Sequence, residues 1–332
     1  PLDFAAKGSC QIGGCISTNA GGVNVLRYGM ARAMVLGLEV VLPDGTILSA
    51  MDKMMKNNAG YDLKQLFVGT EGTLGVITRA VVRLMPLPIT QNTALVALSD
   101  FPAVSRFLNY LKESLGTNLS AFELMWGDYL KAVTKPGWHK SPIDRNHPFY
   151  VLYESDGSDA ERDDARFLEV LENAFSDELI IDAVIPKSNN ERQAVWAIRD
   201  DFEAILNPKP MHLYDVSLSI TEMEEYVSAV KQTMSELLPA SRTYVLGHVG
   251  DGNLHFFVQT RSDVPNERAL CDRAIYESLR AHKGSISAEH GIGVEKKMWL
   301  SQCRSDAEIK TMELLKQTFD PEGILNTRLI IG

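Results

Sequence analysis

The sequence YVLGHVGDGNLHFFV, residues 244–258, predicts a β-hairpin that carries two histidines. Residues 244–248 and 254–258 are rich in β-branched and aromatic side chains, which favour strands. The Gly-Asp-Gly-Asn turn between them tolerates backbone with a positive φ. Because a hairpin places its two ends side by side, His248 and His255 are expected to reach one metal ion.

A second motif, SAEHGIG at residues 287–293, supplies the other groups of a metal site. Glu289 offers a carboxylate oxygen, and two nitrogens with one oxygen suit Zn²⁺, Mn²⁺ or Fe²⁺ while leaving positions open for a substrate. His290 then stays available for proton transfer, since an imidazole has a pKa of about 6.5. A single histidine is more often structural, but the glycines around both motifs favour metal-assisted chemistry.

Composition limits the class of protein and its partners. The chain has 332 residues, 45% of them hydrophobic, which predicts a globular protein of about two domains. A net charge of -10 argues against nucleic acid or an anionic membrane surface as the main partner. The four cysteines form no C-x-x-C pair, and no apolar run is long enough for a transmembrane segment. We expect a reducing compartment: the cytoplasm in a bacterium, or the mitochondrial matrix in a eukaryote.

Residues 1–92 are predicted to form short strands joined by glycine loops. The loops lie in SCQIGGCISTNAGG (9–22) and within LFVGTEGTLGVITRAVVRLMPLP (66–88), where we expect a strand, a loop and a strand. A Pro-Asp-Gly turn at residues 43–45 predicts a hairpin. Bare backbone of this kind can approach a planar or phosphorylated cofactor closely, although a loop-rich β structure without a ligand is the alternative. Neither loop is a nicotinamide fingerprint or a Walker loop.

Residues 93–284 alternate between predicted strands and amphipathic helices, which indicates a sheet covered by helices and a second domain. Helices are expected at 102–115, 159–175, 190–206, 222–238 and 266–281. A capping box at Thr221 is expected to start the fourth of these helices. Residues 285–332 carry Glu289 and His290 and then form a mainly helical tail. The predicted fold class is therefore α+β.

Seven motifs in this order resemble one family of flavoenzymes. The chain resembles the FAD-linked D-2-hydroxyacid dehydrogenases of the vanillyl-alcohol oxidase superfamily, the branch with D-lactate and D-2-hydroxyglutarate dehydrogenases and the glycolate oxidase flavin subunit. The motifs run from residue 8 to residue 326 and are GSCQIGGCISTNAGGVNVLRYG, NNAGYDLKQLFVGTEGTLGVIT, AIRD, YDVSL, GHVGDGNLH, SAEHGIG and FDPEGILN. The resemblance implies the later half of a FAD-binding domain (1–92), an antiparallel-sheet cap domain (93–284), and a C-terminal segment that returns to the first domain (285–332).

The resemblance also implies roles for particular residues. Arg199 and Asn253 would grip the substrate carboxylate, as a guanidinium fork does well. His248, His255 and Glu289 would hold the metal, with His290 as the base. The residues expected to contact FAD are Gly13, Gly14, Thr18, Asn19, Gly21, Gly22, Glu71, Gly72, Leu74, Gly75, Ile77 and Asn326.

The implied reaction is FAD- and metal-dependent oxidation of a D-2-hydroxy acid to the 2-oxo acid, with hydride passing to FAD. Zn²⁺ is the first choice of metal, with Mn²⁺ or Fe²⁺ next. An electron-transfer flavoprotein, a quinone or a cytochrome would accept the electrons, and a homodimer is compatible with the sequence. A metallohydrolase using the same ligands is disfavoured because it would leave the glycine loops without a purpose.

The sequence departs from the family pattern at several places. The phosphate-binding half that relatives carry ahead of GSCQIGG is absent and the chain begins with Pro1, so we expect a segment of a longer protein that holds FAD weakly by itself. Leu213 stands where relatives have a lysine, which favours a D-lactate-like substrate over D-2-hydroxyglutarate. Cys15 replaces an asparagine, and Thr327 follows Asn326 where relatives have proline. The alternative function is therefore a non-catalytic metal-binding module that needs a partner chain to complete the FAD site.

Overall fold

The computed structural model describes residues 1–207, 210–261, 264–328 and 330–331. The chain divides into two compact units, which are described separately. Unit 1 consists of Pro1–Pro86 and Ser285–Gly332, and unit 2 of Leu87–Gly284. A division into compact units does not show that either folds alone, so the predicted domain boundaries stay a prediction.

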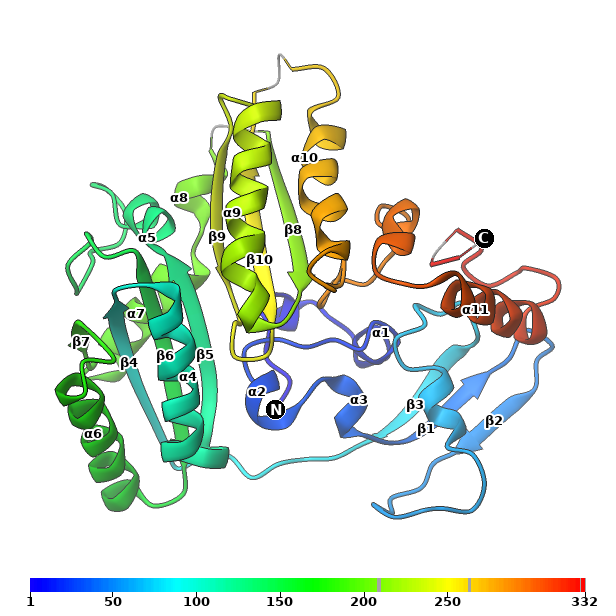
Figure 1. Cartoon of the computed structure of the whole chain (residues 1–332). Coiled ribbons are helices and arrows are strands. Elements are labelled where there is room, and N and C mark those ends of the chain that lie inside the picture. Colours follow the sequence, from blue (N-terminus) through cyan, green and yellow to red (C-terminus); the bar gives the residue numbers. More distant parts are fainter. Residues whose placement is uncertain (208–209, 262–263, 329, 332) are drawn as a thin grey trace. The chain divides into compact units, whose positions relative to one another are not determined.

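Unit 2 is built on an antiparallel sheet whose described part has seven strands in the order β7-β4-β6-β5-β9-β10-β8 (Figure 1). Every neighbouring pair runs antiparallel, as the family resemblance implied. The strands are β4 (Thr90–Leu98), β5 (Leu119–Trp126), β6 (Phe149–Gly157), β7 (Asp182–Val184), β8 (Met211–Ser217), β9 (Arg242–Gly247) and β10 (Asn253–Gln259). All residues of β5 and β6 are buried, which places these strands at the centre of the unit.

Helices cover both faces of this sheet. One face packs against α4 (Phe101–Leu115), α6 (Ala160–Ser176), α9 (Ile220–Leu237) and α10 (Glu267–Tyr276), with aromatic contacts such as Phe107 against Tyr153 at 5.5 Å. The other face packs against α5 (Gly127–Val133), α7 (Asn189–Asp200) and α8 (Glu203–Leu206), around Met125, Leu246 and Phe257. Side chains alternate between the two faces along a strand. A residue two positions before or after Met125, Leu246 or Phe257 in the same strand therefore points to this second face as well.

The predicted hairpin at residues 244–258 is confirmed by the pairing of β9 with β10. His255 lies opposite Leu246, and the turn is closed by bonds from the Asp251 and Asn253 N–H groups to the His248 carbonyl, both 3.1 Å. Gly252 has a φ of +95°, so a residue with a side chain would be strained there. A Cβ at Gly247 would lie 2.3 Å from the Asn253 carbonyl oxygen, which explains the glycine before His248.

Most predicted helices of unit 2 are present, with two corrections. The predicted helix 190–206 is broken into α7 and α8, because Asp201 leaves the helical conformation and its carboxylate pairs with His139 Nε2 at 3.0 Å. The predicted capping box at Thr221 is wrong. The helix begins at Ile220, and its N-cap residue Ser219 makes no side-chain capping bond to the backbone.

Unit 1 contains a small sheet flanked by short helices. The described strands, in the order β2-β1-β3, are β1 (Val35–Val41), β2 (Ile47–Ala50) and β3 (Val76–Val82), and β1 and β2 form the predicted hairpin with Gly45 at a φ of +84°. The helical segments are η1 (Ala5–Gly8), α1 (Ile12–Ser17), α2 (Val25–Tyr28), α3 (Ala31–Met34), η2 (Leu63–Leu66), η5 (Lys297–Gln302) and α11 (Asp306–Phe319).

Two predictions for unit 1 are wrong. Gly13 and Gly14 lie in helix α1 and not in a loop, and the predicted strand at residues 66–68 is the end of η2 followed by a turn. Burial explains both differences, since Ile16, Phe67 and Val68 pack in one apolar cluster with Leu38 of β1. Tertiary packing of this kind overrides the weak helix preference of glycine.

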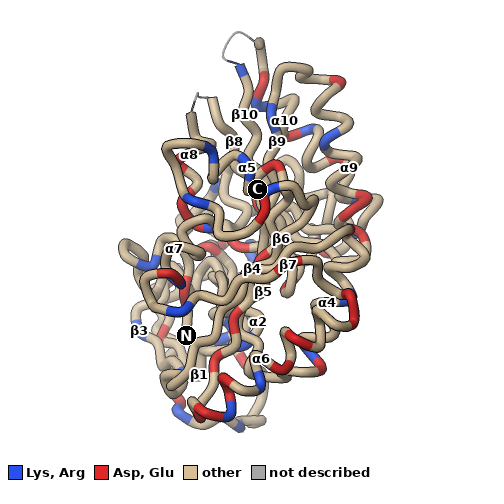
Figure 2. Tube along the Cα trace, turned by 90° about the vertical axis from the view of Figure 1, so that its left-hand side faces the viewer, with Lys and Arg blue, Asp and Glu red and all other residues tan. Residues whose placement is uncertain are grey.

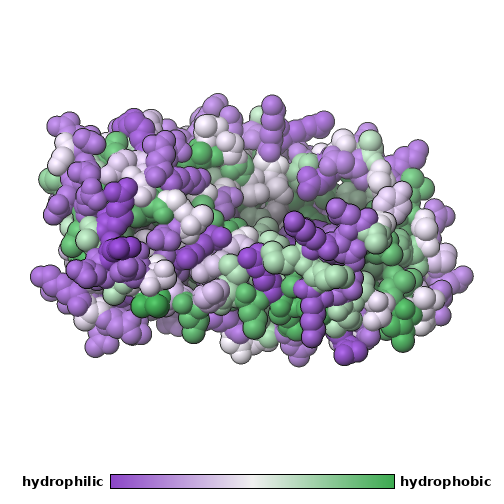
Figure 3. Space-filling model, turned by 90° about the horizontal axis from the view of Figure 1, so that it is seen from below, coloured by the Kyte–Doolittle hydropathy of each residue, from purple (hydrophilic) through white to green (hydrophobic). Residues whose placement is uncertain are grey.

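Charged residues of both signs are distributed over the chain. Figure 2 shows Lys and Arg interspersed with Asp and Glu along the trace, without an extended basic stripe. Within the described residues, no helix combines the length and the apolar character that crossing a membrane requires. Exposed apolar side chains gather in unit 1 around β2 and β3, at the right of Figure 3. They include Ile47 of β2, Val76 and Val82 of β3, and Leu84 shortly after β3.

Candidate active site

The two histidines of the hairpin lie together on one face of the unit 2 sheet. His248 follows β9 two residues after Leu246, and His255 precedes Phe257 by two residues in β10, so both share the face covered by α7. Their ring centroids are 5.2 Å apart, and a nitrogen of each ring lies within 4.8 Å of one on the other. One metal ion can bridge such a separation.

A buried carboxylate lies behind His248. Glu123 of β5 is 1% exposed, and its Oε1 lies 2.7 Å from His248 Nδ1. Its Oε2 accepts a bond of 2.7 Å from Nε of Arg199, near the end of α7. Arg199 Nη1 donates to Asp200 at 3.1 Å, and Nη2 lies 3.1 Å from His248 Nε2. Glu123, Arg199 and His248 therefore form one buried network, and Arg199 is not the exposed residue that its helix position alone would suggest.

Electrostatics follow from this burial. Desolvation by itself would raise the pKa of Glu123, but its electrostatic interactions and hydrogen bonds with His248 and Arg199 outweigh desolvation and lower the pKa to about 2. For Arg199, desolvation would lower the pKa, and the Glu123 carboxylate reverses the effect and raises it. Glu123 is thus a carboxylate and Arg199 a cation across the physiological range. An ion pair of this kind stabilises only when both partners are in place.

Other polar groups border the histidines on the same sheet face. Asn253 is the first residue of β10 and 3% exposed, and neither of its side-chain amide atoms has a hydrogen-bond partner among the described residues. Asp215 of β8 lies directly opposite His255 and is fully buried. Leu213, opposite Phe257, is 45% exposed. A buried amide without partners is costly, so Asn253 is suited to bind a polar ligand.

The donor set around the histidines fits a divalent metal. Metal-bound histidines usually donate their second ring N–H to a carboxylate, and Glu123 accepts from Nδ1 of His248 in this way. The lone pair of Nε2 is then directed to the Arg199 side. A metal ion on Nε2 would replace the hydrogen bond from Arg199 Nη2. Glu289, the third predicted ligand, belongs to unit 1, so its joining the two histidines stays a prediction.

Unit 1 has its own cavity of about 480 Å³, lined by segments around residues 18–32, 65–74 and 285–331. Five lining residues have left-handed backbone: Asn19 (φ 51°), Gly69 (φ 79°), Glu71 (φ 52°), Gly291 (φ 76°) and Ile330 (φ 58°). The N–H groups of Gly69 and Glu71 donate to the carbonyls of Ile16 and Ser17, so these turns are closed by the protein itself. The cavity is a candidate site for part of a cofactor, whose contact with these residues stays a prediction.

Glu71 holds the SAEHGIG loop in place beside this cavity. Its carboxylate accepts bonds from the backbone N–H groups of Ile292 at 2.6 Å and Gly293 at 2.9 Å. Its carbonyl accepts from Asn326 Nδ2 at 2.5 Å, which ties the C-terminal tail to the same turn. The loop fixed by these bonds carries Glu289, which lines the cavity, and the exposed His290.

The residues predicted to contact FAD divide into two groups. Those that line the unit 1 cavity are Thr18, Asn19, Glu71 and Leu74. Those that lie outside its described lining are Gly13, Gly14, Gly21, Gly22, Gly72, Gly75, Ile77 and Asn326. For Gly22 and Gly75 packing is a sufficient reason, since a Cβ would lie 2.1 Å from the Asp3 carbonyl or 2.5 Å from Val40 Cγ1. Their role toward FAD stays a prediction.

Three site residues were not found from the sequence. Glu123 and Asp215 are acidic residues within strongly apolar strands, and a charge at such a position is itself a sign of a buried pair. Arg32 lines the unit 1 cavity and donates to the carbonyls of Gln65 at 3.0 Å and Val68 at 2.6 Å. Its sequence position gives no comparable sign.

Comparison with known proteins identifies two regions of the chain. Residues 87–329 match the family model for the C-terminal domain of FAD linked oxidases, and residues 1–50 match a FAD binding domain. A putative mitochondrial D-lactate dehydrogenase of Schizosaccharomyces pombe is 38% identical over 98% of this chain and 64% of its own length. The mitochondrial D-2-hydroxyglutarate dehydrogenase of Rattus norvegicus is 40% identical over 98% of this chain and 61% of its length. The chain thus spans less than two thirds of these two relatives.

Solved structures share the fold at low identity. p-Cresol methylhydroxylase with bound substrate has a TM-score of 0.73 and 15% identity, covering 99% of this chain and 71% of that one. Alkyldihydroxyacetonephosphate synthase has a TM-score of 0.65 and 17% identity over 95% of this chain and 57% of that one. The predicted α+β fold class, a partial FAD-binding domain followed by an antiparallel-sheet domain, is confirmed.

The Glu123 network can be tested through stability. Changing Glu123 to Gln keeps the shape but leaves Arg199 buried without its main counter-charge. We expect the free energy of unfolding to fall by roughly 3 kcal/mol, near the lower end for a broken buried ion pair because Asp200 still contacts Arg199. Glu113→Gln, on the exposed side of α4, is the matched control and should change stability by less than about 0.5 kcal/mol. Equal denaturant midpoints for the two variants would contradict the assignment.

Proposed function

Because the chain belongs to the FAD-linked oxidase family, we propose that it oxidises a D-2-hydroxy acid to the 2-oxo acid, with FAD and a divalent metal ion as cofactors. The observation that carries this proposal is the pairing of His248 with His255 on one sheet face, next to the unpartnered amide of Asn253. The named activities of the D-lactate and D-2-hydroxyglutarate dehydrogenase relatives support the substrate class.

In this proposal Arg199 and Asn253 bind the substrate carboxylate. Arg199 directs three of its N–H donors at Glu123, Asp200 and His248, and its other N–H groups stay available for a carboxylate. Asn253 would supply a further donor from its buried amide. Leu213, exposed on the same face, offers no second cation, so a short acid such as D-lactate fits better than the dicarboxylate D-2-hydroxyglutarate.

Proton transfer falls to His290. Its imidazole would take the proton of the substrate hydroxyl, and Glu71 would keep the loop that carries it in position through the Ile292 and Gly293 N–H groups. When bound, the metal would act as a Lewis acid on the hydroxyl and FAD would accept the hydride. The metal would be held by His248, His255 and Glu289, with Zn²⁺ preferred to Mn²⁺ or Fe²⁺. An electron-transfer flavoprotein, a quinone or a cytochrome would then reoxidise the flavin.

A second candidate function is a metal-binding module that requires a partner chain to complete the FAD site. The exposed apolar side chains around β2 and β3 of unit 1 favour it, since surfaces of this kind commonly pack against another chain or segment. In that case residues 1–332 would bind metal and leave FAD largely unbound. The whole-protein activity would then depend on the partner.

One assay of hydroxy-acid oxidation distinguishes the two candidate functions. The purified chain is incubated with FAD, Zn²⁺ and a dye acceptor, and D-lactate, L-lactate and D-2-hydroxyglutarate are compared by kcat/KM. Oxidation of D-lactate above both other acids supports the first proposal, in which Leu213 offers no second cation to a dicarboxylate. A metal-containing chain that stays colourless and inactive supports the second candidate. Preference for L-lactate would contradict the first proposal.

The metal ligands can be tested by metal content. Replacing His248, His255 or Glu289 with Ala should reduce metal affinity by about 10-fold or more, because one of three protein ligands is lost. Elemental analysis after dialysis measures the bound equivalent. Glu225→Gln is the matched control, since Glu225 belongs to a separate Glu-Glu-His cluster with Glu222 and His282. Retention of a full equivalent by all three Ala variants would refute the ligand set.

The predicted roles of His290 as a base and Glu289 as a metal ligand can be told apart by measuring kcat and metal content together. In the active enzyme, His290→Asn should lower kcat by about 100-fold, the usual scale for loss of a general base, while the metal content stays unchanged. Parallel measurement of kcat and bound metal is therefore required. Loss of metal in this variant would instead make His290 a ligand.

A further inference from the structure

A cavity of about 800 Å³, open to solvent, lies in unit 2 where α5 leads into the loop before β6. Its lining carries four cationic side chains against one carboxylate, that of Asp144, in a chain whose net charge is -10. The four cations are Lys131, Lys135, Lys140 and Arg145. A local surplus of positive charge on an acidic protein is suited to an anionic ligand.

Hydrogen bonds within the loop hold this cavity in shape. Ser141 Oγ donates to the Ile143 carbonyl at 2.7 Å, and Tyr150 donates to the Asp144 carbonyl at 2.6 Å. His139 Nε2 lies 3.0 Å from Asp201 beyond the end of α7, which fixes the middle of the loop. A site that is already ordered loses little entropy when a ligand binds.

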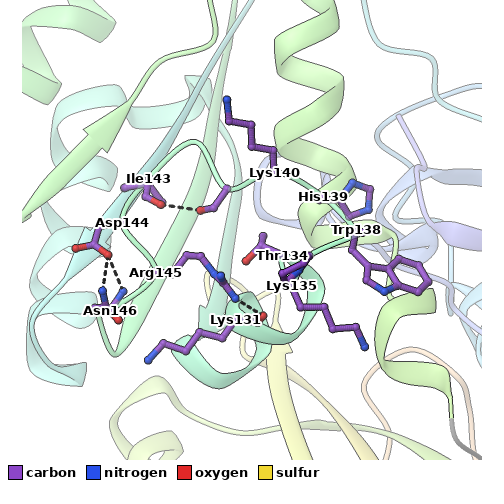
Figure 4. Close-up of a pocket in the computed structure, with 13 residues that line it drawn as sticks. Lys131, Thr134, Lys135, Trp138, His139, Lys140, Ile143, Asp144, Arg145 and Asn146 are labelled. Atoms are coloured by element: carbon purple, nitrogen blue, oxygen red, sulfur yellow. Dashed lines mark hydrogen bonds between the residues drawn. The ribbon is translucent and has the colours of Figure 1, made fainter.

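Arg145 is the central donor of the lining (Figure 4). Its Nη2 donates to the Lys131 carbonyl at 2.8 Å, while its Nε is buried and has no hydrogen-bond partner among the described residues. Lys131, Lys140 and Arg145 form no ion pair with any residue that the structure describes. An incoming anion would face the Arg145 guanidinium and the two ammonium groups without competing against an ion pair within the protein.

Geometry and charge together indicate the class of ligand. We propose that this cavity binds a small phosphorylated molecule, with its phosphate at Arg145 and the flexible Lys131 and Lys140 closing around it. A guanidinium fork and mobile ammonium groups are the usual pair for phosphate recognition. Trp138, 42% exposed in the lining, offers a flat face to the organic part of the ligand. This site is separate from the His248 cluster and does not depend on the proposed oxidation.

The test is a calorimetric titration of the whole chain with inorganic pyrophosphate at low ionic strength. We expect saturable binding that is weakened at least 10-fold in Arg145→Gln and in the double variant Lys131→Gln/Lys140→Gln. The matched control, Lys112→Gln/Lys187→Gln, removes the same charge from exposed positions elsewhere in unit 2 and should bind within twofold of the unmodified chain. Added salt should weaken the binding.

Two results would overturn the proposal. One is the absence of saturable binding to the unmodified chain at millimolar pyrophosphate. The other is equal binding by the pocket variants and the control, which would place pyrophosphate elsewhere, including the unit 1 cavity. Because Lys131 and Lys140 are exposed, their double variant keeps the test valid even if Arg145→Gln disturbs the loop.

Discussion

The buried ion pair between Glu123 and Arg199 is the constraint on which the candidate active-site face of unit 2 depends. A carboxylate that is 1% exposed in a central strand must find charged or hydrogen-bonding partners, and it finds them in Arg199 and His248. Arg199 must therefore reach the sheet from α7, and Nδ1 of His248 faces the carboxylate. Nε2 of the same ring lies 3.1 Å from Arg199 Nη2.

In unit 1 a carboxylate is likewise held by hydrogen bonds, but the donors are backbone N–H groups. Glu71 lies at a φ of 52° and directs its carboxylate at the N–H groups of Ile292 and Gly293, more than two hundred residues later in the chain. This contact joins the glycine turn to the loop with Glu289 and His290. Glu71 was predicted to contact FAD, and Glu289 and His290 were predicted to bind metal and to transfer a proton. In the structure the side chain of Glu71 holds the loop that carries Glu289 and His290.

Arg199 and Arg145, two cationic side chains of unit 2, differ in whether a carboxylate pairs with them. Arg199 pairs with the buried carboxylate of Glu123 and with the exposed carboxylate of Asp200, so much of its charge serves to order the protein. Arg145 lacks such a partner among the described residues and lies in an open, preformed loop. The difference between the two arginines is that Arg199 is ion-paired with Glu123, whereas Arg145 forms no ion pair among the described residues.

The sequence by itself determined the elements whose signals are local. It predicted the hairpin with His248 and His255 on one face, because strand periodicity and the Gly-Asp-Gly-Asn turn act within a few residues. It also predicted a sheet with covering helices, and its motifs carried the resemblance to FAD-linked enzymes, which implied that the sheet is antiparallel. Which nitrogen of His248 faces Glu123 could not follow from such signals.

Only the tertiary structure decided the remaining features. Gly13 and Gly14 became helical because their neighbour Ile16 packs against β1, and the predicted helix 190–206 broke where Asp201 pairs with His139. The partnership of Glu123 with Arg199 joins residues 76 positions apart. Buried charges and apolar clusters of this kind depend on segments brought together by the whole fold, whereas propensity and periodicity report only on a single turn or strand.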